Sequence, residues 1–183
     1  MDKIIYSIIN QFGIVALFVV FWLITHTFFH ELGHGIAIRL FSKDRVILVI
    51  GSCSNTIKGN YYFKIQLYKV IIYISKIKLK DMHLGRALSS SNYQDFTSNQ
   101  IRIIALAGFI GQSLYIFLIL IIIYLFDVKD NMWPTFIICL FMSIFSWFFS
   151  PDRKNFFEPI KFKQNYLSLC KINSTYDYNK FIK

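Results

Sequence analysis

The sequence predicts an all-α polytopic membrane protein, with a three-span core and a small β-hairpin or sheet inserted between the first two spans. Composition predicts the membrane class: 55% of the residues are hydrophobic and only 16% are charged, whereas a soluble domain carries about 25% charged residues. The insertion is predicted by the connection after the first apolar stretch, where apolar and polar residues alternate in places. Such alternation is typical of strands.

Three apolar stretches are long enough to cross a bilayer, whose hydrocarbon core is about 30 Å thick. The predicted spans cover residues 12–40, 101–126 and 132–149, approximately. The first stretch lacks a small-residue cleavage site, so we expect a mature span and not a signal peptide. The chain then divides into a membrane core over residues 1–155 and a basic cytoplasmic tail over 156–183.

The connection over residues 42–100 is predicted to contain strands. Val46–Ile50 is a short β-branched run, and apolar residues alternate with polar ones along Phe63–Leu67. The alternation predicts a half-buried strand. Its phase slips at Tyr68 and Lys69, which predicts a bulge or a second turn at that point.

The distribution of Lys and Arg predicts the orientation, because cytoplasmic loops carry the excess of these residues. Segment 42–100 holds nine of the twenty and segment 153–183 holds seven. Three spans place both segments on one side, so we expect the N-terminus outside and the C-terminus in the cytoplasm.

The abundance of Ile, Lys, Asn, Phe and Tyr suits an AT-rich bacterial genome, so the predicted location is a bacterial cell membrane. The chain has a net charge of +10. We expect its basic residues to lie near anionic lipid at the cytoplasmic membrane surface, and we expect no nucleic-acid partner.

The sequence from His30 to His34 reads His-Glu-Leu-Gly-His, the pattern H-E-x-x-H. A helix places positions i and i+4 on one face, so both imidazoles can bind one zinc ion with Glu31 poised as a general base. In a chain with four His and two Glu, chance placement produces the pattern about once in a thousand sequences. The alternative is a set of polar residues at a helix end, although ionisable groups at membrane depth are costly and usually functional.

A catalytic zinc ion takes three protein ligands and keeps one position open, so a further ligand is needed. Asp127 and Asp130 are predicted to lie on the outer side of the membrane. Asp95 and Asp152, near the inner ends of the second and third spans, remain as candidates. His26 shares the helix face of the motif, but positions eight apart on a helix are about 12 Å apart. We therefore expect His26 to support a ligand or to pack.

These residues resemble the motifs of the site-2 protease family of intramembrane zinc metalloproteases. That family has a three-span core with H-E-x-x-H on the first core helix, Gly-Pro-x-x-Asn on the second and Asp-Gly near the third. Here His30–His34 matches the first motif in full. The second is matched in its glycines and spacing, with Phe109 in the proline position and Gln112 in the asparagine position. Asp152 matches the aspartate of the third motif, followed by Arg153 instead of glycine.

The resemblance covers most of residues 12–155 and implies a site. It implies one zinc ion (Zn²⁺) per chain, bound by His30, His34 and Asp152. Glu31 is then the general base, and Gln112 a contact for the oxyanion or the substrate.

The implied function is an intramembrane zinc metalloendopeptidase, which uses a zinc-activated water to cleave a membrane-embedded or membrane-associated peptide near the cytoplasmic face. A helical substrate has to unwind first, and the stretch Phe63–Leu67 is predicted to pair with it as an added strand. The sheet could equally serve only to shield the site. The alternatives are a catalytically inactive family member, a partner subunit that binds zinc without turnover, and a structural or transport-associated protein with an accidental motif. No nucleic-acid partner and no particular oligomeric state are implied.

The predicted orientation can be tested by cysteine labelling in intact cells. A single cysteine placed at Ser90 should be protected from a membrane-impermeant thiol reagent, because its segment carries nine of the basic residues that stay in the cytoplasm. The same cysteine should react after the membrane is permeabilised. Efficient labelling of intact cells would reverse the orientation.

Overall fold

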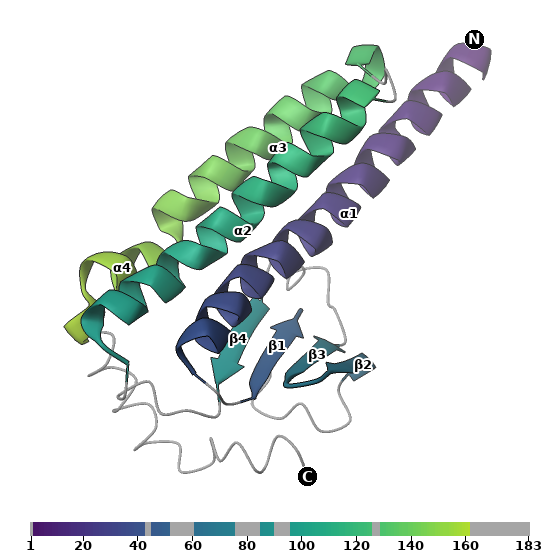
Figure 1. The fold of residues 1–183 in the computed structure, drawn as a ribbon. Helices are drawn as coiled ribbons and strands as arrows, with labels where there is room; N and C mark the ends of the chain where they lie inside the picture. The colour runs from purple at the N-terminus through teal and green to yellow at the C-terminus, as the bar shows by residue number, and fades with distance from the viewer. Residues whose placement is uncertain are drawn as a thin grey trace.

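The computed structural model of the chain describes residues 2–42, 45–51, 61–75, 85–89, 96–125 and 129–161. Its helices and strands are, in chain order, α1 (Asp2–Phe41), β1 (Val46–Ile50), β2 (Tyr61–Leu67), β3 (Val70–Ser75), β4 (Gly85–Ser89), α2 (Ser98–Leu125), α3 (Lys129–Phe149) and α4 (Pro151–Phe157). Figure 1 shows the three long helices running side by side, with the sheet against the C-terminal half of α1. Helix α4 follows α3 at the end of the bundle where the sheet also lies.

Two helices in the described part of the chain are long and apolar enough to cross a membrane: Val15–Phe41 within α1 and the whole of α2. Helices α3 and α4 pass the same test together, as Phe136–Phe149 and Pro151–Phe157, with a bend of 48° between them. These helices are consistent with the predicted membrane insertion. The third predicted span lies within α3, and it counts as a third membrane-spanning segment only if this bent pair of helices is one span.

The helices begin earlier than the apolar runs suggest. Helix α1 starts at Asp2 instead of residue 12, and α3 starts at Lys129 instead of residue 132. An apolar run marks the part of a helix that fits a bilayer and says nothing of its polar ends. Helix α2 begins after a capping box, in which Thr97 N donates to Gln100 Oε1 at 2.7 Å and Gln100 N donates to Thr97 Oγ1 at 3.3 Å.

The insertion between α1 and α2 forms a four-stranded mixed sheet in the order β2-β3-β1-β4. Strand β1 pairs parallel with β3 and antiparallel with β4, and all five of its residues are buried. Strands β2 and β3 form a hairpin, and the predicted irregularity at Tyr68 and Lys69 is the two-residue turn between them. Strand β4 is not among the predicted strands.

Strand β2 departs from the half-buried strand that its alternation predicts. All of its residues are exposed, including Phe63, Ile65 and Leu67. It lies at the end of the sheet away from β1 and packs chiefly on β3. The described helices cover neither face of β2. Its apolar and polar side chains alternate, but neither set is buried.

Two clusters of buried side chains pack against successive parts of α1. One joins the C-terminal part of α1 to β1, β3 and the start of α2, and it includes Ile38, Leu48 and Ile104. The other joins the preceding part of α1 to α2 and α3, and it includes Trp22 and Phe136. The stretch of α1 that carries the two motif histidines lies between these clusters.

Helices α1 and α2 cross at backbone contact. A Cβ atom added to Gly33 would collide with the carbonyl oxygen of Ala107, and one added to Gly111 would collide with that of Phe29. Only glycine permits this approach at both positions, as small residues do where membrane helices pack closely. The crossing brings the motif histidines directly onto α2.

Candidate metal centre

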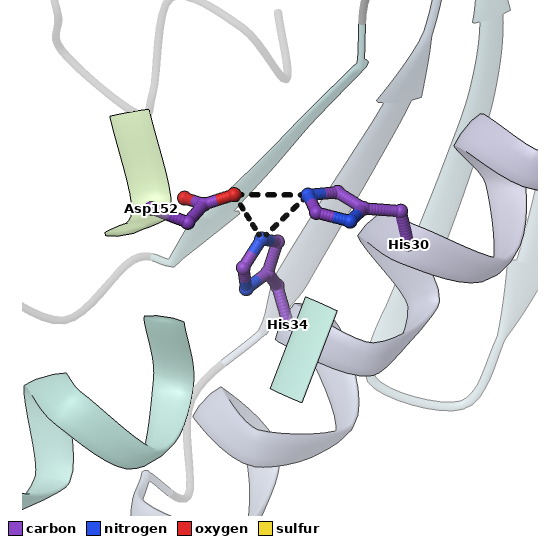
Figure 2. A group of neighbouring side chains, drawn as sticks. All are labelled: His30, His34 and Asp152. Carbon is purple, nitrogen blue, oxygen red and sulfur yellow. Dashed lines mark hydrogen bonds and ion pairs between the residues drawn. The ribbon is translucent and has the colours of Figure 1, made fainter. Parts of the chain in front are cut away.

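Three side chains from two distant parts of the chain meet beside the α1–α2 crossing (Figure 2). His30 and His34 lie one turn apart on α1, and Asp152 comes from α4. Asp152 Oδ2 is 2.9 Å from His30 Nε2 and 3.2 Å from His34 Nε2, and the two Nε2 atoms are 3.1 Å apart. These three residues form a group of ligand atoms that could hold a metal ion.

The chain turns between α3 and α4 in a way that presents Asp152. Ser150 caps α4: its Oγ accepts a hydrogen bond from Asp152 N at 3.1 Å and donates to Asp152 Oδ2 at 2.9 Å. Pro151 occupies the first turn, where a missing N–H costs nothing. Ser-Pro-Asp is a signal for a helix start that the sequence interpretation overlooked.

Arg153 is turned away from the carboxylate that precedes it. Its Nη1 donates to the carbonyl oxygen of Phe148 at 3.1 Å, and its guanidinium lies 5.5 Å from the centre of the Phe148 ring. The residue that takes the place of glycine in the third motif therefore leaves the Asp152 carboxylate facing the histidines.

A backbone contact sets the proton position on one of the imidazoles. His34 Nδ1 lies 2.6 Å from the carbonyl oxygen of Ile104, which is an acceptor only, so Nδ1 carries the proton and donates. In the neutral ring Nε2 then presents a lone pair. This lone pair faces Asp152 Oδ2, another acceptor, at 3.2 Å. A cation between His34 Nε2 and Asp152 Oδ2 would interact favourably with both atoms.

The spacing of the three atoms suits a small tetrahedral ion. Zinc–ligand bonds of about 2.1 Å place ligand atoms roughly 3.4 Å apart at the corners of a tetrahedron. The observed separations of 2.9, 3.1 and 3.2 Å are close to that value. Two imidazoles and one carboxylate also form a donor set used by catalytic zinc. The residues present therefore fit the predicted ion.

Glu31 lies beside this group without belonging to it. Its side chain is buried, with 6% of its surface exposed. Gly85, at the start of β4, packs against the carboxylate: an added Cβ would lie 2.6 Å from Glu31 Oε1. A strand that the sequence did not predict thus covers the predicted base. A glycine that starts a strand is a weak signal, and Gly85 was not a candidate before the fold was known.

Gly108 makes room for both rings. A Cβ atom added there would collide with His34 Nε2 and would lie 2.8 Å from His30 Cε1. The second motif contains two glycines of α2, Gly108 and Gly111, which have different surroundings. Gly111 serves the helix crossing, and Gly108 serves the site.

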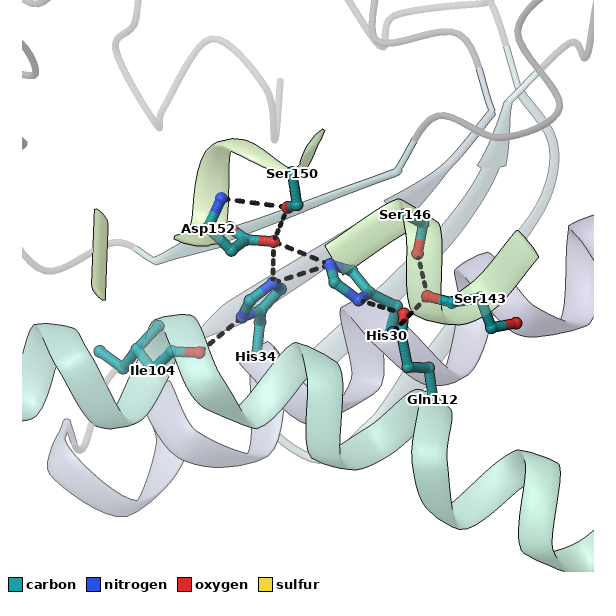
Figure 3. Close-up of polar contacts among 8 residues, drawn as sticks. All are labelled: His30, His34, Ile104, Gln112, Ser143, Ser146, Ser150 and Asp152. Atoms are coloured by element: carbon teal, nitrogen blue, oxygen red, sulfur yellow. Dashed lines mark hydrogen bonds and ion pairs between the residues drawn. The ribbon is translucent and has the colours of Figure 1, made fainter. Parts of the chain in front are cut away.

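The remaining candidates have separate positions. Gln112 is almost fully buried, and its Oε1 lies 3.1 Å from His30 Nδ1 (Figure 3). Its predicted contact with an oxyanion stays a prediction. His26 stacks on Trp22 with the ring planes at 20°, and its buried Nε2 has no hydrogen-bond partner among the described residues. Asp95 lies outside the described residues.

Comparison with known proteins gives no match: no family model, curated protein or solved structure matches this chain. The resemblance to the site-2 protease family therefore rests on the short sequence motifs alone. The fold adds an independent observation. Residues of the first and third motifs, 122 positions apart, lie within hydrogen-bond distance of each other.

Asp152→Ala should lose most of the bound zinc, because the change removes one of three ligands. The loss should exceed the roughly 10–100-fold that loss of a supporting residue costs. Zinc content of the purified protein and competition with a chelator measure it. Asp95→Ala is the matched control and should keep the metal. The reverse pattern would make Asp95 the third ligand.

Gly108→Ala should also reduce zinc binding strongly, because the new methyl group occupies the space of the His34 ring. Gly13→Ala is the control, since a Cβ added there meets nothing within 4 Å. Both variants are compared by zinc content and by helical circular dichroism. A folded Gly108→Ala variant with undiminished zinc would show that the ring does not need this space.

Proposed function

We propose that this chain is an intramembrane zinc metallopeptidase of the site-2 protease type, cleaving a membrane-embedded or membrane-associated peptide near one face of the bilayer. One observation carries the proposal. The imidazoles of His30 and His34 and the carboxylate of Asp152 converge to within 3.2 Å, on helices apolar enough to cross a membrane, and Glu31 lies next to them.

Zinc bound by these three residues would supply Lewis acidity that polarises water and the scissile carbonyl. The chain supplies the proton transfers. Glu31 accepts the proton from the attacking water at its carboxylate and returns it to the leaving amine. Gly85, which has no Cβ atom, leaves the space that this carboxylate occupies.

The exposure of the ligands supports a hydrolytic role. The His30 and Asp152 side chains keep 17% and 20% of their surface exposed, while that of His34 keeps 8%. The exposed edge gives water and a peptide a way to the ligands, and the buried side holds the metal in place. A purely structural zinc site would be closed by a fourth protein ligand, and among the residues that the structure describes the group contains three.

The sheet contributes to the site through β4 and not through β2. Strand β4 contacts α1 and packs over Glu31, whereas β2 is separated from β1 by β3. This arrangement supports the interpretation in which the sheet shields the site. Edge pairing of a substrate with Phe63–Leu67 of β2 would leave both β2 and β3 between the peptide and β1.

The position of Arg153 bears on the catalytically inactive alternative. Its replacement of glycine is the main sequence feature in favour of an inactive family member. Because the guanidinium contacts Phe148, it does not compete for the carboxylate of Asp152. The Arg153 substitution therefore leaves the Asp152 carboxylate available as a metal ligand, which the proposed enzyme requires.

Glu31→Gln should strongly reduce turnover without loss of zinc, because an amide cannot accept the proton from water. General-base catalysis is worth about 10²–10⁴-fold, and cleavage should fall by that factor. The assay uses purified protein reconstituted with a panel of single-span peptides, with products identified by mass spectrometry. Unchanged cleavage would exclude Glu31 as the base, and loss of zinc from the variant would make it a ligand.

A further inference from the structure

We propose that Gln112 is a positioning residue that holds the proton of His30 on Nδ1, and so leaves Nε2 as the atom that binds the metal. The inference rests on the proposed zinc centre but not on peptide cleavage. It assigns to Gln112 a role toward the histidine, distinct from the oxyanion contact that the sequence suggests.

The starting point is the orientation of the Gln112 amide, which α3 determines. Gln112 Nε2 donates to the carbonyl oxygen of Ser143 at 3.4 Å. The same oxygen accepts a 2.7 Å hydrogen bond from Ser146 Oγ, so it is an acceptor engaged from two sides (Figure 3). Rotating the amide by 180° would bring Gln112 Oε1 against this carbonyl, with two acceptors facing each other.

With the amide oriented in this way, its oxygen faces His30. Gln112 Oε1 lies 3.1 Å from His30 Nδ1. An amide oxygen only accepts hydrogen bonds, so Nδ1 must donate and carries the proton. Nε2 of a neutral ring is then deprotonated, and it is this atom that lies 2.9 Å from Asp152 Oδ2 and 3.1 Å from His34 Nε2.

The Nδ1 protons of the two histidines are thus held by different kinds of acceptor. The carbonyl of Ile104 fixes the proton of His34, and no side-chain substitution at residue 104 removes that acceptor. The proton of His30 depends on a side chain, which is replaceable. Hydrogen bonds of this kind orient the ligand ring and raise its basicity, and their loss typically costs about 10–100-fold in metal affinity.

The burial of Gln112 agrees with this role. Only 1% of its surface is exposed, and both of its amide atoms have partners within the helix bundle. An amide that stabilised an oxyanion would have to leave the Ser143 carbonyl in order to donate to the substrate. That movement would also release His30.

The test compares the zinc affinity of two substitutions at one position in the full-length protein. Gln112→Met keeps the length of the side chain and removes the acceptor, so zinc affinity should fall about 10–100-fold in chelator competition. Gln112→Glu keeps an acceptor for His30, and in its neutral form a hydroxyl that can donate to Ser143. Its zinc affinity should stay close to that of the wild type.

Gln100→Met is the matched control, since it makes the same change in the capping box at the start of α2, away from His30. Its zinc affinity should not change, although the start of the helix loses a hydrogen bond. A general loss of α2 stability would lower the affinity of both Met variants. Equal affinities of Gln112→Met and the wild type, or equal losses in Gln112→Met and Gln112→Glu, would overturn the proposal.

A measurement on the unchanged protein gives an independent test. In zinc-loaded protein with ¹⁵N-labelled histidine, the His30 ring should show a protonated Nδ1 and a metal-bound Nε2. Metal bound through Nδ1 would overturn the proposal even if the variants do not fold. Because neither readout involves a peptide, a protein that binds zinc as proposed and cleaves nothing would refute the peptidase function and leave the role of Gln112 standing.

Discussion

Helices α1 and α2 touch through their backbones, and this contact determines where every other part of the site can lie. Gly33 and Gly111 permit it. At this separation His34 reaches a main-chain carbonyl of α2, and the two imidazole rings occupy the space left by Gly108. A larger side chain at any of these glycines would move the rings away from the helix that orients them. The positions of the candidate metal ligands therefore depend on residues with no side chain.

The third helix and the sheet complete the site from opposite directions. Helix α3 supplies the Ser143 carbonyl that orients an amide on α2, and the bend into α4 brings the Asp152 carboxylate to the two imidazoles. The sheet packs on the C-terminal half of α1, where β4 covers Glu31. The candidate metal ligands and the proposed base thus lie at the junction between the apolar bundle and the sheet, where buried and accessible surfaces meet.

The sequence sufficed for features set by local spacing. His30, Glu31 and His34 follow from helix periodicity, and the membrane class follows from long apolar runs. The contact between His30 and Asp152 was expected only from a family resemblance, because spacing in the chain does not show which carboxylate folds back over 122 positions. Strand β4 was missed because Gly85–Ser89 does not alternate. The exposure of β2 was missed because alternation cannot tell whether anything covers a strand.

The distance between the ligands along the chain has a consequence for biosynthesis. Two of them are near residue 30, and the third is 122 positions further on. A nascent chain that has released α1 from the ribosome holds only a pair of histidines, which bind zinc weakly compared with the full set. The centre becomes complete only after α3 has been made and the bend into α4 has formed. The proposed hydrolytic centre is therefore incomplete while the chain's own spans are still entering the membrane.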